Sequence, residues 1–399
     1  MPKKPTVKSH TAFPAALPLS PVEDVTTSRH LTLLTKLRLA ACSAGRCEFR
    51  GHNRDLYQHP VTGTPGNFSE AAHIVAFRVR GPRGDALRPE DVNDFANLML
   101  LCADCHHLID TEPANYPVEL LREYKREHEE RIFEVTAVGP EYRTTVIQLR
   151  ATIGGQAVDI PGTDIRTALR PRFPARLPGV LVDLTPIQRE DPRFFDLARD
   201  QIRRELRPAI RAELERGGVQ HYSVFALAPI PVLMCLGREI GNKVTANLFQ
   251  RQRDQSWRWK EDGPVVQFNF RKVREGSEAG LVALQLAVSG ALSLESLPPE
   301  LQAASVYEIA PVDRPPGVEC VRRREDLDSF RQTYRDGLRD IDRGHGHIAA
   351  IHVFPAVPAP VAVACGMDVM PKAHPALAVY DFVKGAFRQS ITINTEEDL

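Results

Sequence analysis

Two pairs of potential metal ligands constrain the fold of this chain more than any other feature. Cys102 and Cys105 form a CxxC motif, and Cys47 and His52 lie upstream, five residues apart. A CxxC motif can supply two thiolates to one ion, but zinc requires four ligands at tetrahedral angles, so a second pair must join it. We therefore predict a structural zinc site formed by these four residues. Cys42, which lies five residues before Cys47, is an alternative ligand.

The segment between the two pairs contains two apolar stretches that are typical of strands. SEAAHIVAF (69–77) contains His73, and NLMLLC (97–102) begins at Asn97, after which CHHLID begins a helix. Strand, loop, strand and helix, with His, Asn and His in this order, resemble the HNH endonuclease family over residues 42–110. The resemblance implies a zinc-stabilised ββα-metal fold and a metal-dependent endonuclease that hydrolyses double-stranded DNA.

The resemblance also implies a role for each conserved residue type of the family's motif. His73 would be the general base that takes a proton from water, since the ordinary pKa of histidine lies near neutrality. Asn97 would brace the loop that carries His73, and His106 would bind the catalytic divalent ion, expected to be Mg²⁺. His107 is the less favoured metal ligand, because the family's histidine directly follows the second cysteine.

One position departs from the family's pattern. Many HNH enzymes carry an acidic metal ligand just before the first histidine, and this chain has Ala72 there. Glu70 lies nearby and is a possible substitute. Without such an acid, the alternative is a zinc-stabilised binding module that has no catalytic activity.

The loop after His73 contains Arg78, Arg80, Arg83 and Arg88. Arginines in such a loop can contact DNA phosphates in a sequence-independent, salt-sensitive way. The first three are our candidates for DNA binding, and the alternative is a solvated loop.

A stretch rich in glycine and proline, residues 146–178, separates this region from the rest of the chain. We expect a proline-rich arm over 1–25 within an amino-terminal domain over 1–145, then a linker over 146–178. Beyond it, apolar strands alternate with amphipathic helices, which favours an α/β domain with a largely parallel sheet over 179–399.

An internal repeat lies within this last domain. Shifting the chain by 129 residues aligns 224–248 with 353–377 and gives eight identities in 25 positions, among them Gly237 with Gly366 and Lys243 with Lys372. We interpret the repeat as a duplicated half-domain that forms a pseudo-symmetric pair with a cleft between its copies. A chance similarity between two α/β units is the alternative.

The last domain resembles the SAVED domain in the segments HIAAIHVFPAVPAPVAVACG (347–366) and HPALAVYDF (374–382). SAVED domains resemble two fused CARF-like (Rossmann-like) units and are fused to effectors of bacterial CBASS anti-phage systems. The resemblance implies a cyclic dinucleotide activator, made by a partner nucleotidyltransferase. Its binding would drive assembly into a dimer or tetramer and switch on DNA degradation.

Candidate ligand-binding residues follow from the chemistry of such a messenger. Its bases require aromatic or guanidinium faces, and its phosphates require cations or N–H groups. Spacing by two on a strand would place both tryptophans on one face, although core packing is the alternative for them. The candidates are Thr185, Arg189, Lys243, Trp257, Trp259, Lys260, Pro358 and Lys372.

Charge and hydropathy exclude several classes of protein. Lys and Arg number 51, as do Asp and Glu, which excludes a uniformly basic nucleic-acid coat. No apolar run approaches the roughly 20 residues that span a bilayer, so we expect a protein of the bacterial cytoplasm with no membrane partner. Two alternatives for the last domain stay open: activation by a cyclic trinucleotide, and a reader of modified DNA in a restriction-type enzyme.

Overall fold

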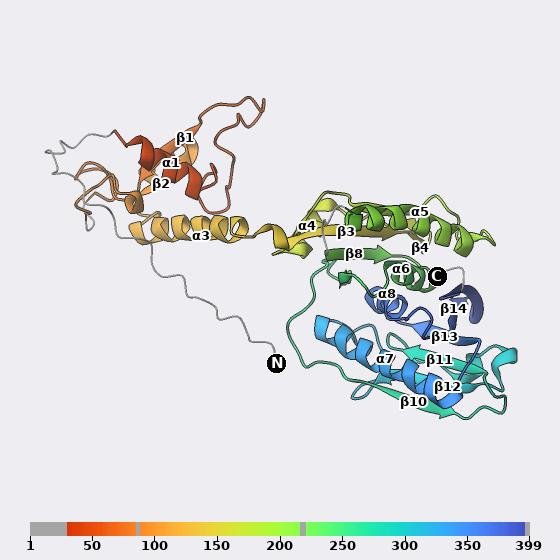
Figure 1. The fold of residues 1–399 in the computed structure, drawn as a ribbon. Helices are drawn as coiled ribbons and strands as arrows, with labels where there is room; N and C mark the ends of the chain where they lie inside the picture. Colours follow the sequence, from red (N-terminus) through yellow and green to blue (C-terminus); the bar gives the residue numbers. More distant parts are fainter. Residues whose placement is uncertain (1–29, 85–87, 216–220, 396–399) are drawn as a thin grey trace, which may run out of the picture. The chain divides into compact units, whose positions relative to one another are not determined.

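The computed structural model describes residues 30–84, 88–215 and 221–395 (Figure 1). The expected arm over 1–25 lies outside them. The chain divides into two compact units, Met1–Ala137 and Val138–Leu399, which we call the amino-terminal and carboxy-terminal units and describe separately. The boundary precedes the stretch that we predicted to be a linker.

The amino-terminal unit is built around a two-stranded antiparallel sheet. All five residues of its second strand are buried, as its unbroken apolar sequence predicts. The polar face of the long third helix is exposed, and Val118 and Leu121 on its other face join the core. The elements are α1 (Leu33–Cys42), β1 (Ser69–His73), the 3₁₀ turn Phe95–Asn97, β2 (Leu98–Cys102), α2 (Ala103–Thr111) and α3 (Val118–Thr136).

The first half of the carboxy-terminal unit contains a parallel sheet of order β6-β3-β8-β9, with β7 also paired to β3. The expected linker over 146–178 is wrong, because β3 is a buried, central strand of this sheet and α4 covers one of its faces. The elements are a 3₁₀ turn (Pro140–Tyr142), β3 (Arg143–Arg150), β4 (Thr152–Ile153), β5 (Gln156–Ala157), α4 (Gly162–Leu169), β6 (Phe173–Pro174), β7 (Val180–Asp183), α5 (Phe194–Glu215), β8 (His221–Leu227), α6 (Ile230–Ile240) and β9 (Thr245–Phe249).

The second half contains a six-stranded sheet of order β10-β12-β11-β13-β14-β15. Its inner strands are parallel and its two edge strands are antiparallel to their neighbours. The elements are β10 (Phe268–Arg274), β11 (Val282–Ala287), the 3₁₀ turns Leu294–Ser296 and Pro299–Leu301, β12 (Ser305–Pro311), α7 (Arg324–His345), β13 (Ala350–Ala356), α8 (Ala359–Met367), β14 (Ala376–Val383) and β15 (Ala386–Ile393).

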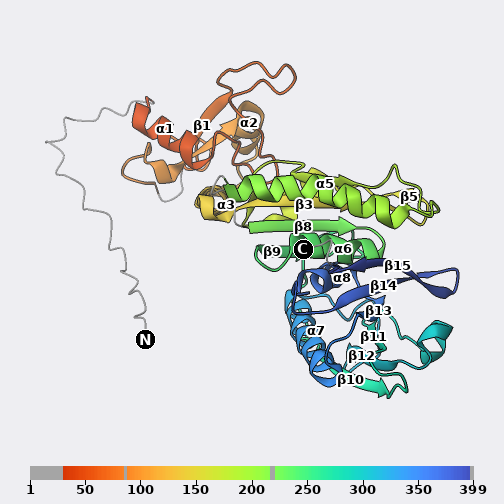
Figure 2. The same cartoon turned by 45° about the vertical axis from the view of Figure 1, so that its right-hand side comes forward.

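The sequence repeat corresponds to a repeated strand–helix–strand unit. The first copy spans β8, α6 and β9, and the second spans β13, α8 and β14, with parallel strands in both. Helices α6 and α8 lie side by side between the two sheets (Figures 1 and 2). Residues of both halves contribute to one continuous apolar core around these helices.

Two glycines matched by the repeat allow this close helix packing. A Cβ atom on Gly237 would lie 1.9 Å from the carbonyl oxygen of Val363, and one on Gly366 would lie 1.9 Å from that of Met234. Met234 and Val363 are themselves matched by the repeat. The contact is therefore pseudo-symmetric, and only glycine permits it in either helix.

Among the residues that the structure describes, no helix combines the length and the apolar character needed to cross a membrane.

Candidate nuclease and ligand-binding sites

The four predicted zinc ligands converge in the amino-terminal unit. The ligand atoms of Cys47, His52, Cys102 and Cys105 all lie within 4.8 Å of one another. Nδ1 of His52 is 3.6 Å from Sγ of Cys102 and 3.2 Å from Sγ of Cys105. Three sulfur atoms and one imidazole nitrogen are a donor set that fits a tetrahedral metal ion. The alternative ligand Cys42 is the last residue of α1 and is not a member of this group.

Burial disfavours the thiolate form of the cysteines in this cluster. Burial raises the pKa of the Cys47 and Cys105 thiols. The neighbouring cysteines raise the pKa of Cys105 further, whereas the backbone N–H groups of Cys102 and Phe49 oppose the rise at Cys47. A bound metal ion reverses this effect, because it stabilises thiolates directly. The Cys102 sulfur also caps α2 by accepting the backbone N–H of Cys105 at 3.5 Å. Metal binding would therefore fix the start of the helix that carries His106.

His73, the predicted general base, is the last residue of β1 and is half-buried. Its Nε2 lies 3.0 Å from Oδ1 of Asn93, and its ring contacts the edge of Phe77. An amide oxygen can only accept a hydrogen bond, so the ring proton lies on Nε2 when the imidazole is neutral. Nδ1 is then unprotonated and can accept a proton from water.

Asn97 is buried and makes the contacts that a bracing residue requires. Its Oδ1 accepts the N–H of Val75 at 2.9 Å, and its Nδ2 donates to the carbonyl oxygens of Val75 and Val92, each at 2.9 Å. Its carbonyl oxygen accepts the N–H of Ile74 at 2.8 Å. Both partners Ile74 and Val75 directly follow His73, so Asn97 fixes the backbone that positions the imidazole.

Two of the loop arginines hold the same backbone instead of facing solvent. Arg83 is 8% exposed, and it donates to the carbonyl oxygens of Ile74 at 2.7 Å and Ile109 at 2.5 Å. Arg88 donates to the carbonyl oxygens of Ala76, at 3.2 Å, and Phe77. A DNA contact by Arg83 conflicts with this geometry, because its guanidinium is already buried among internal acceptors. Of the three candidates for DNA binding, Arg78 and Arg80 are exposed.

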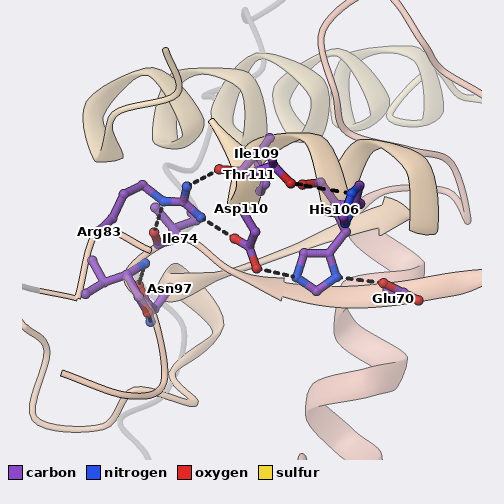
Figure 3. A network of polar contacts seen from close by, with 10 residues as sticks. Glu70, Ile74, Arg83, Asn97, His106, Ile109, Asp110 and Thr111 are labelled. Atoms are coloured by element: carbon purple, nitrogen blue, oxygen red, sulfur yellow. Dashed lines mark hydrogen bonds and ion pairs between the residues drawn. The ribbon is translucent and has the colours of Figure 1, made fainter. Parts of the chain in front are cut away.

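His106 lies between two carboxylates (Figure 3). Its Nδ1 is 2.7 Å from Oε2 of Glu70 on β1, and its Nε2 is 3.5 Å from Oδ2 of Asp110, one turn later on α2. Asp110 also pairs with Arg83 at 2.9 Å. The hydrogen bond to Asp110, and then that to Glu70, raises the pKa of His106 although burial opposes this. Burial also opposes ionisation of Asp110, but His106 and Arg83 outweigh it and lower the pKa of this carboxyl.

These groups are a suitable donor set for a hard divalent ion, since they offer carboxylate oxygens and an imidazole nitrogen. The two carboxylates contact different ring nitrogens, so an ion bound by His106 must replace one of these contacts. Asp110 was not predicted as a site residue, although its spacing of four residues from His106 on a helix is a usable signal.

Ala72 and His107 have different surroundings. Ala72 is fully buried in the core, whereas Glu70, two residues earlier on the same strand, reaches His106. Residues two apart share a strand face, which explains how Glu70 can approach the position of the missing acid. His107 is exposed and its Nε2 lies 3.5 Å from Oγ1 of Thr111 on its own helix.

In the carboxy-terminal unit, three of the predicted ligand residues follow strands at their carboxyl ends, which we call the carboxyl edge. Thr185 follows β7 and donates to Oδ1 of Asp183 through both its N–H and its hydroxyl. Arg189 forms an ion pair with Asp381 and stacks on Phe194 and Phe195 at 4.6 Å. Pro358 is the N-cap of α8 after β13.

The repeat-matched lysines lie at the opposite end of the strands, the amino edge. Lys243 precedes β9 and Lys372 precedes β14, and each strand is parallel to the strand before the intervening helix. The structure therefore separates these exposed lysines from Thr185, Arg189 and Pro358, and the eight candidates do not form one site.

The two tryptophans do not share a strand face, because residues 257–259 are not in a strand. Trp257 is 3% exposed and packs edge-on against Phe225 in the core beneath α4. Trp259 is half-buried, and its Nε1 donates to the carbonyl oxygen of Leu248 at 3.0 Å. Lys260 pairs with Asp254 at 2.7 Å. The alternative of core packing describes Trp257, whereas Trp259 is partly accessible.

Comparison with known proteins agrees with this division. The family model of an HNH endonuclease matches residues 47–112, and that of the SMODS-associated and fused to various effectors sensor domain, SAVED, matches 200–393. No curated protein matches the sequence significantly.

Two solved structures with similar folds are Cap4 SAVED/CARF-domain containing receptors. The one from Acinetobacter baumannii, solved with the cyclic trinucleotide 2′3′3′-cAAA, is 11% identical with a TM-score of 0.43, and the alignment covers 76% of this chain and 64% of that one. The one from Moraxella osloensis is 11% identical with a TM-score of 0.39, covering 76% and 69%. The two family matches identify the chain as an HNH endonuclease domain joined to a SAVED sensor domain.

Proposed function

We propose that this protein is a DNA endonuclease that a cyclic dinucleotide activates, in CBASS anti-phage defence of the bacterial cytoplasm. The observation that carries the proposal is the presence, in one chain, of a braced histidine in an HNH domain and of a SAVED domain. A nuclease of this kind would harm its own cell if it were always active, so a sensor in the same chain has a clear use.

The proposed chemistry is hydrolysis of a phosphodiester in double-stranded DNA. Nδ1 of His73 takes a proton from water, the resulting hydroxide attacks phosphorus, and the bond from phosphorus to one deoxyribose oxygen breaks, with that oxygen acquiring a proton from solvent. Asn97 positions His73 through the backbone of Val75. Arg78 and Arg80 are the arginines proposed to contact DNA phosphates, since Arg83 has internal partners.

Two metal ions belong to the proposal. Glu70 and His106 would hold the catalytic divalent ion, proposed to be Mg²⁺, which when bound supplies positive charge beside the scissile phosphate. Cys47, His52, Cys102 and Cys105 would hold a structural zinc ion, because four protein ligands leave no open position for substrate.

We propose that the messenger activates the protein through mass action. A cyclic dinucleotide from a partner synthase would bind an assembled arrangement of SAVED domains more tightly than a single one, so its binding energy would drive assembly into a dimer or tetramer. Thr185, Arg189 and Pro358 at the carboxyl edge are the proposed contacts, since ligands of open α/β sheets bind at that edge.

The test of catalysis is cleavage of supercoiled plasmid with Mg²⁺ and a panel of cyclic di- and trinucleotides. His73→Ala should lower the rate by a factor of about 100 or more, as expected for loss of a general base. His107→Ala, on the exposed side of α2, is the matched control and should retain the wild-type rate within a factor of about three.

Equal rates for His73→Ala and wild type would contradict the assignment of the base and favour a zinc-stabilised binding module. Cleavage that ignores every nucleotide would favour a restriction-type enzyme, and a response to trinucleotides alone would change the identity of the messenger.

A further inference from the structure

Four arginines lie close together in α4 and in the segment that follows it. Residues 160–180 contain Arg166, Arg170, Arg172 and Arg176 but only one carboxylate, Asp164, although the whole chain has equal numbers of basic and acidic residues. Arg166 lies in the last turn of α4, Arg170 is the C-cap of that helix, and the other two flank the short strand β6. The segment is therefore locally basic in a chain that has no net charge.

The fold adds a fifth arginine to this group. Arg143 begins β3 and lies opposite Phe173 of β6 in their parallel pair. The N–H of Ala175 donates to the carbonyl oxygen of Thr144 at 2.8 Å, which holds the chain before Arg176 beside the same strand. We call the group the arginine patch, and all its members belong to the first half of the carboxy-terminal unit: Arg143, Arg166, Arg170, Arg172 and Arg176.

The charges of the arginine patch are not neutralised by neighbouring side chains. Among the residues that the structure describes, no member of the patch forms an ion pair with a carboxylate. Arg172 is half-buried, and it donates to the carbonyl oxygen of Glu141 at 3.3 Å, with its guanidinium carbon 5.9 Å from the centre of the Tyr142 ring. The other four arginines are exposed. The patch therefore presents unpaired positive charge to solvent.

Local structure does not account for this concentration of charge. The partial negative charge at the end of α4 stabilises cations only within its last turn, so it gives no reason for Arg143, Arg172 or Arg176. The positive charge is also felt within the unit: burial lowers the pKa of His221 to about 4, and the charge of Arg172 lowers it further. A surface with such a potential attracts a polyanion.

The shape of the patch favours a chain of phosphates over a small ligand. Arg143 and Arg176 line a hollow of about 270 Å³ in which Glu213 is the carboxylate. This volume is below the range of about 300–1,000 Å³ that is typical of small-molecule sites, so the hollow suits a single phosphate group. Duplex DNA carries one negative charge per roughly 1.7 Å of its axis, and guanidinium groups bind phosphates through two parallel hydrogen bonds.

We infer that the arginine patch binds the phosphate backbone of duplex DNA, so that the carboxy-terminal unit contributes a second, sequence-independent contact with DNA. The inference rests on the proposed function for the identity of the polyanion, and it goes beyond it by assigning DNA contacts outside the HNH domain. Arg143 follows Ala137, the last residue of the amino-terminal unit, by six residues. Because the two units are joined so closely in the chain, DNA bound by one unit is at a high local concentration for the other.

Fluorescence anisotropy of the full-length chain with a labelled duplex tests this inference, at a series of NaCl concentrations and without added divalent ions. The variant is Arg166→Ala with Arg170→Ala and Arg176→Ala, because these three side chains are exposed. The slope of log affinity against log salt should fall by about two to three units, since each phosphate contact contributes about 0.9. Affinity at the lowest salt should fall at least about 10-fold.

The matched control removes the same net charge from exposed arginines that pair with carboxylates. It is Arg253→Ala with Arg339→Ala and Arg343→Ala, whose partners are Glu319, Asp336 and Asp340. The control should keep the wild-type affinity for DNA within a factor of about three, because its charges are already neutralised. Near-ultraviolet circular dichroism verifies that both triple variants are folded.

Equal losses of affinity and slope in the two triple variants would overturn the inference, because only the net charge would then matter. Absence of DNA binding by wild type, or a patch variant that loses only its response to a cyclic dinucleotide, would overturn it as well. If DNA affinity is unchanged in the patch variant but plasmid cleavage still depends on the messenger, the inference fails and the proposed function stands. If the patch variant alone loses DNA affinity but wild type never cleaves plasmid, the inference stands and the proposed function fails.

Discussion

The two units of this chain are stabilised by different means. The amino-terminal unit has a small apolar core, and ligand residues and buried hydrogen bonds connect segments that are far apart in sequence. The carboxy-terminal unit instead has one large apolar core between two sheets, with α6 and α8 in close contact at matched glycines. The amino-terminal unit thus supplements a limited core with polar braces and with a Cys/His group suited to a metal ion, whereas the carboxy-terminal unit depends mainly on its large core.

The largest effect should follow loss of a ligand in the metal cluster. Cys105→Ser should release the metal ion and unfold the amino-terminal unit, a loss of about 5 kcal/mol or more, because metal binding supplies much of the folding free energy of small metal-bound domains. Metal content by mass spectrometry and thermal unfolding of the full chain provide the measurement.

Cys42→Ser is the matched control, since Cys42 lies on α1 outside the cluster. Retention of the metal by Cys105→Ser together with its loss from Cys42→Ser would contradict the ligand assignment.

The next largest effect should come from the buried arginine of the same unit. Arg83→Ala should lower the free energy of unfolding by about 3 kcal/mol, because the buried carbonyl oxygens of Ile74 and Ile109 lose their donor and the partly exposed Asp110 loses its ion-pair partner. Urea denaturation of the full chain measures the change.

Exposed Arg80→Ala is the comparison for this prediction. It should leave stability unchanged and reduce the slope of DNA affinity against salt concentration by about one unit. The same stability loss in both variants would remove the distinction between a structural arginine and a DNA-contacting one.

In the carboxy-terminal unit, the corresponding test concerns the close packing of α6 against α8, which involves no charged group. Gly237→Ala should lower the free energy of unfolding by about 3 kcal/mol, because the new methyl group would meet the Val363 carbonyl and separate α6 from α8. Gly290→Ala is the control, since a Cβ there meets no atom within 4 Å. Equal stability of the two variants, measured by thermal denaturation, would show that the close helix contact is dispensable.

The smallest effect is a pH dependence of the same unit. His221 has a folded-state pKa of about 4 against an ordinary value of 6.5, so unfolding takes up a proton in this range. Its contribution is complete above pH 6.5 and is lost as the pH falls toward 4, by about 2 kcal/mol in total. His221→Asn should make stability less dependent on pH over that interval, as judged by urea titrations at a series of pH values.

His347→Asn, at an exposed position, should leave the pH dependence of wild type unchanged. If the free energy of unfolding of His221→Asn depended on pH below 6.5 as strongly as that of wild type, the imidazole of His221 would have to be solvated in the folded protein.

The convergence of four metal-ligand side chains in the amino-terminal unit could be predicted from the sequence, because its signals are local and have fixed chemistry. Cys47, His52, Cys102 and Cys105 can be recognised by residue type and spacing, and their side chains do converge. The burial of Arg83 could not be predicted, because its acceptors Ile74, Ile109 and Asp110 come from segments that meet only in the folded unit. In the sequence alone, a buried arginine and a DNA-contacting arginine look alike.

Prediction was weaker in the carboxy-terminal unit for a related reason. The alternation of strands and helices predicted its fold class, and the repeat predicted its two halves. Strand β3, Arg143–Arg150, mixes polar and apolar residues without a clear period and lies beside a glycine- and proline-rich stretch that favoured a linker. Thr185 and Lys243 lie at opposite edges of the first sheet, which follows from strand directions that no short motif could reveal.

The rate of plasmid cleavage by the full chain, measured over a titration of cyclic dinucleotide, tests the central claim most directly. We expect only a background rate without nucleotide, and a rise in rate as the nucleotide binds the carboxy-terminal unit and the chain assembles, with no such rise in His73→Ala. A rate that is the same at every nucleotide concentration, or a wild-type response in His73→Ala, would contradict it.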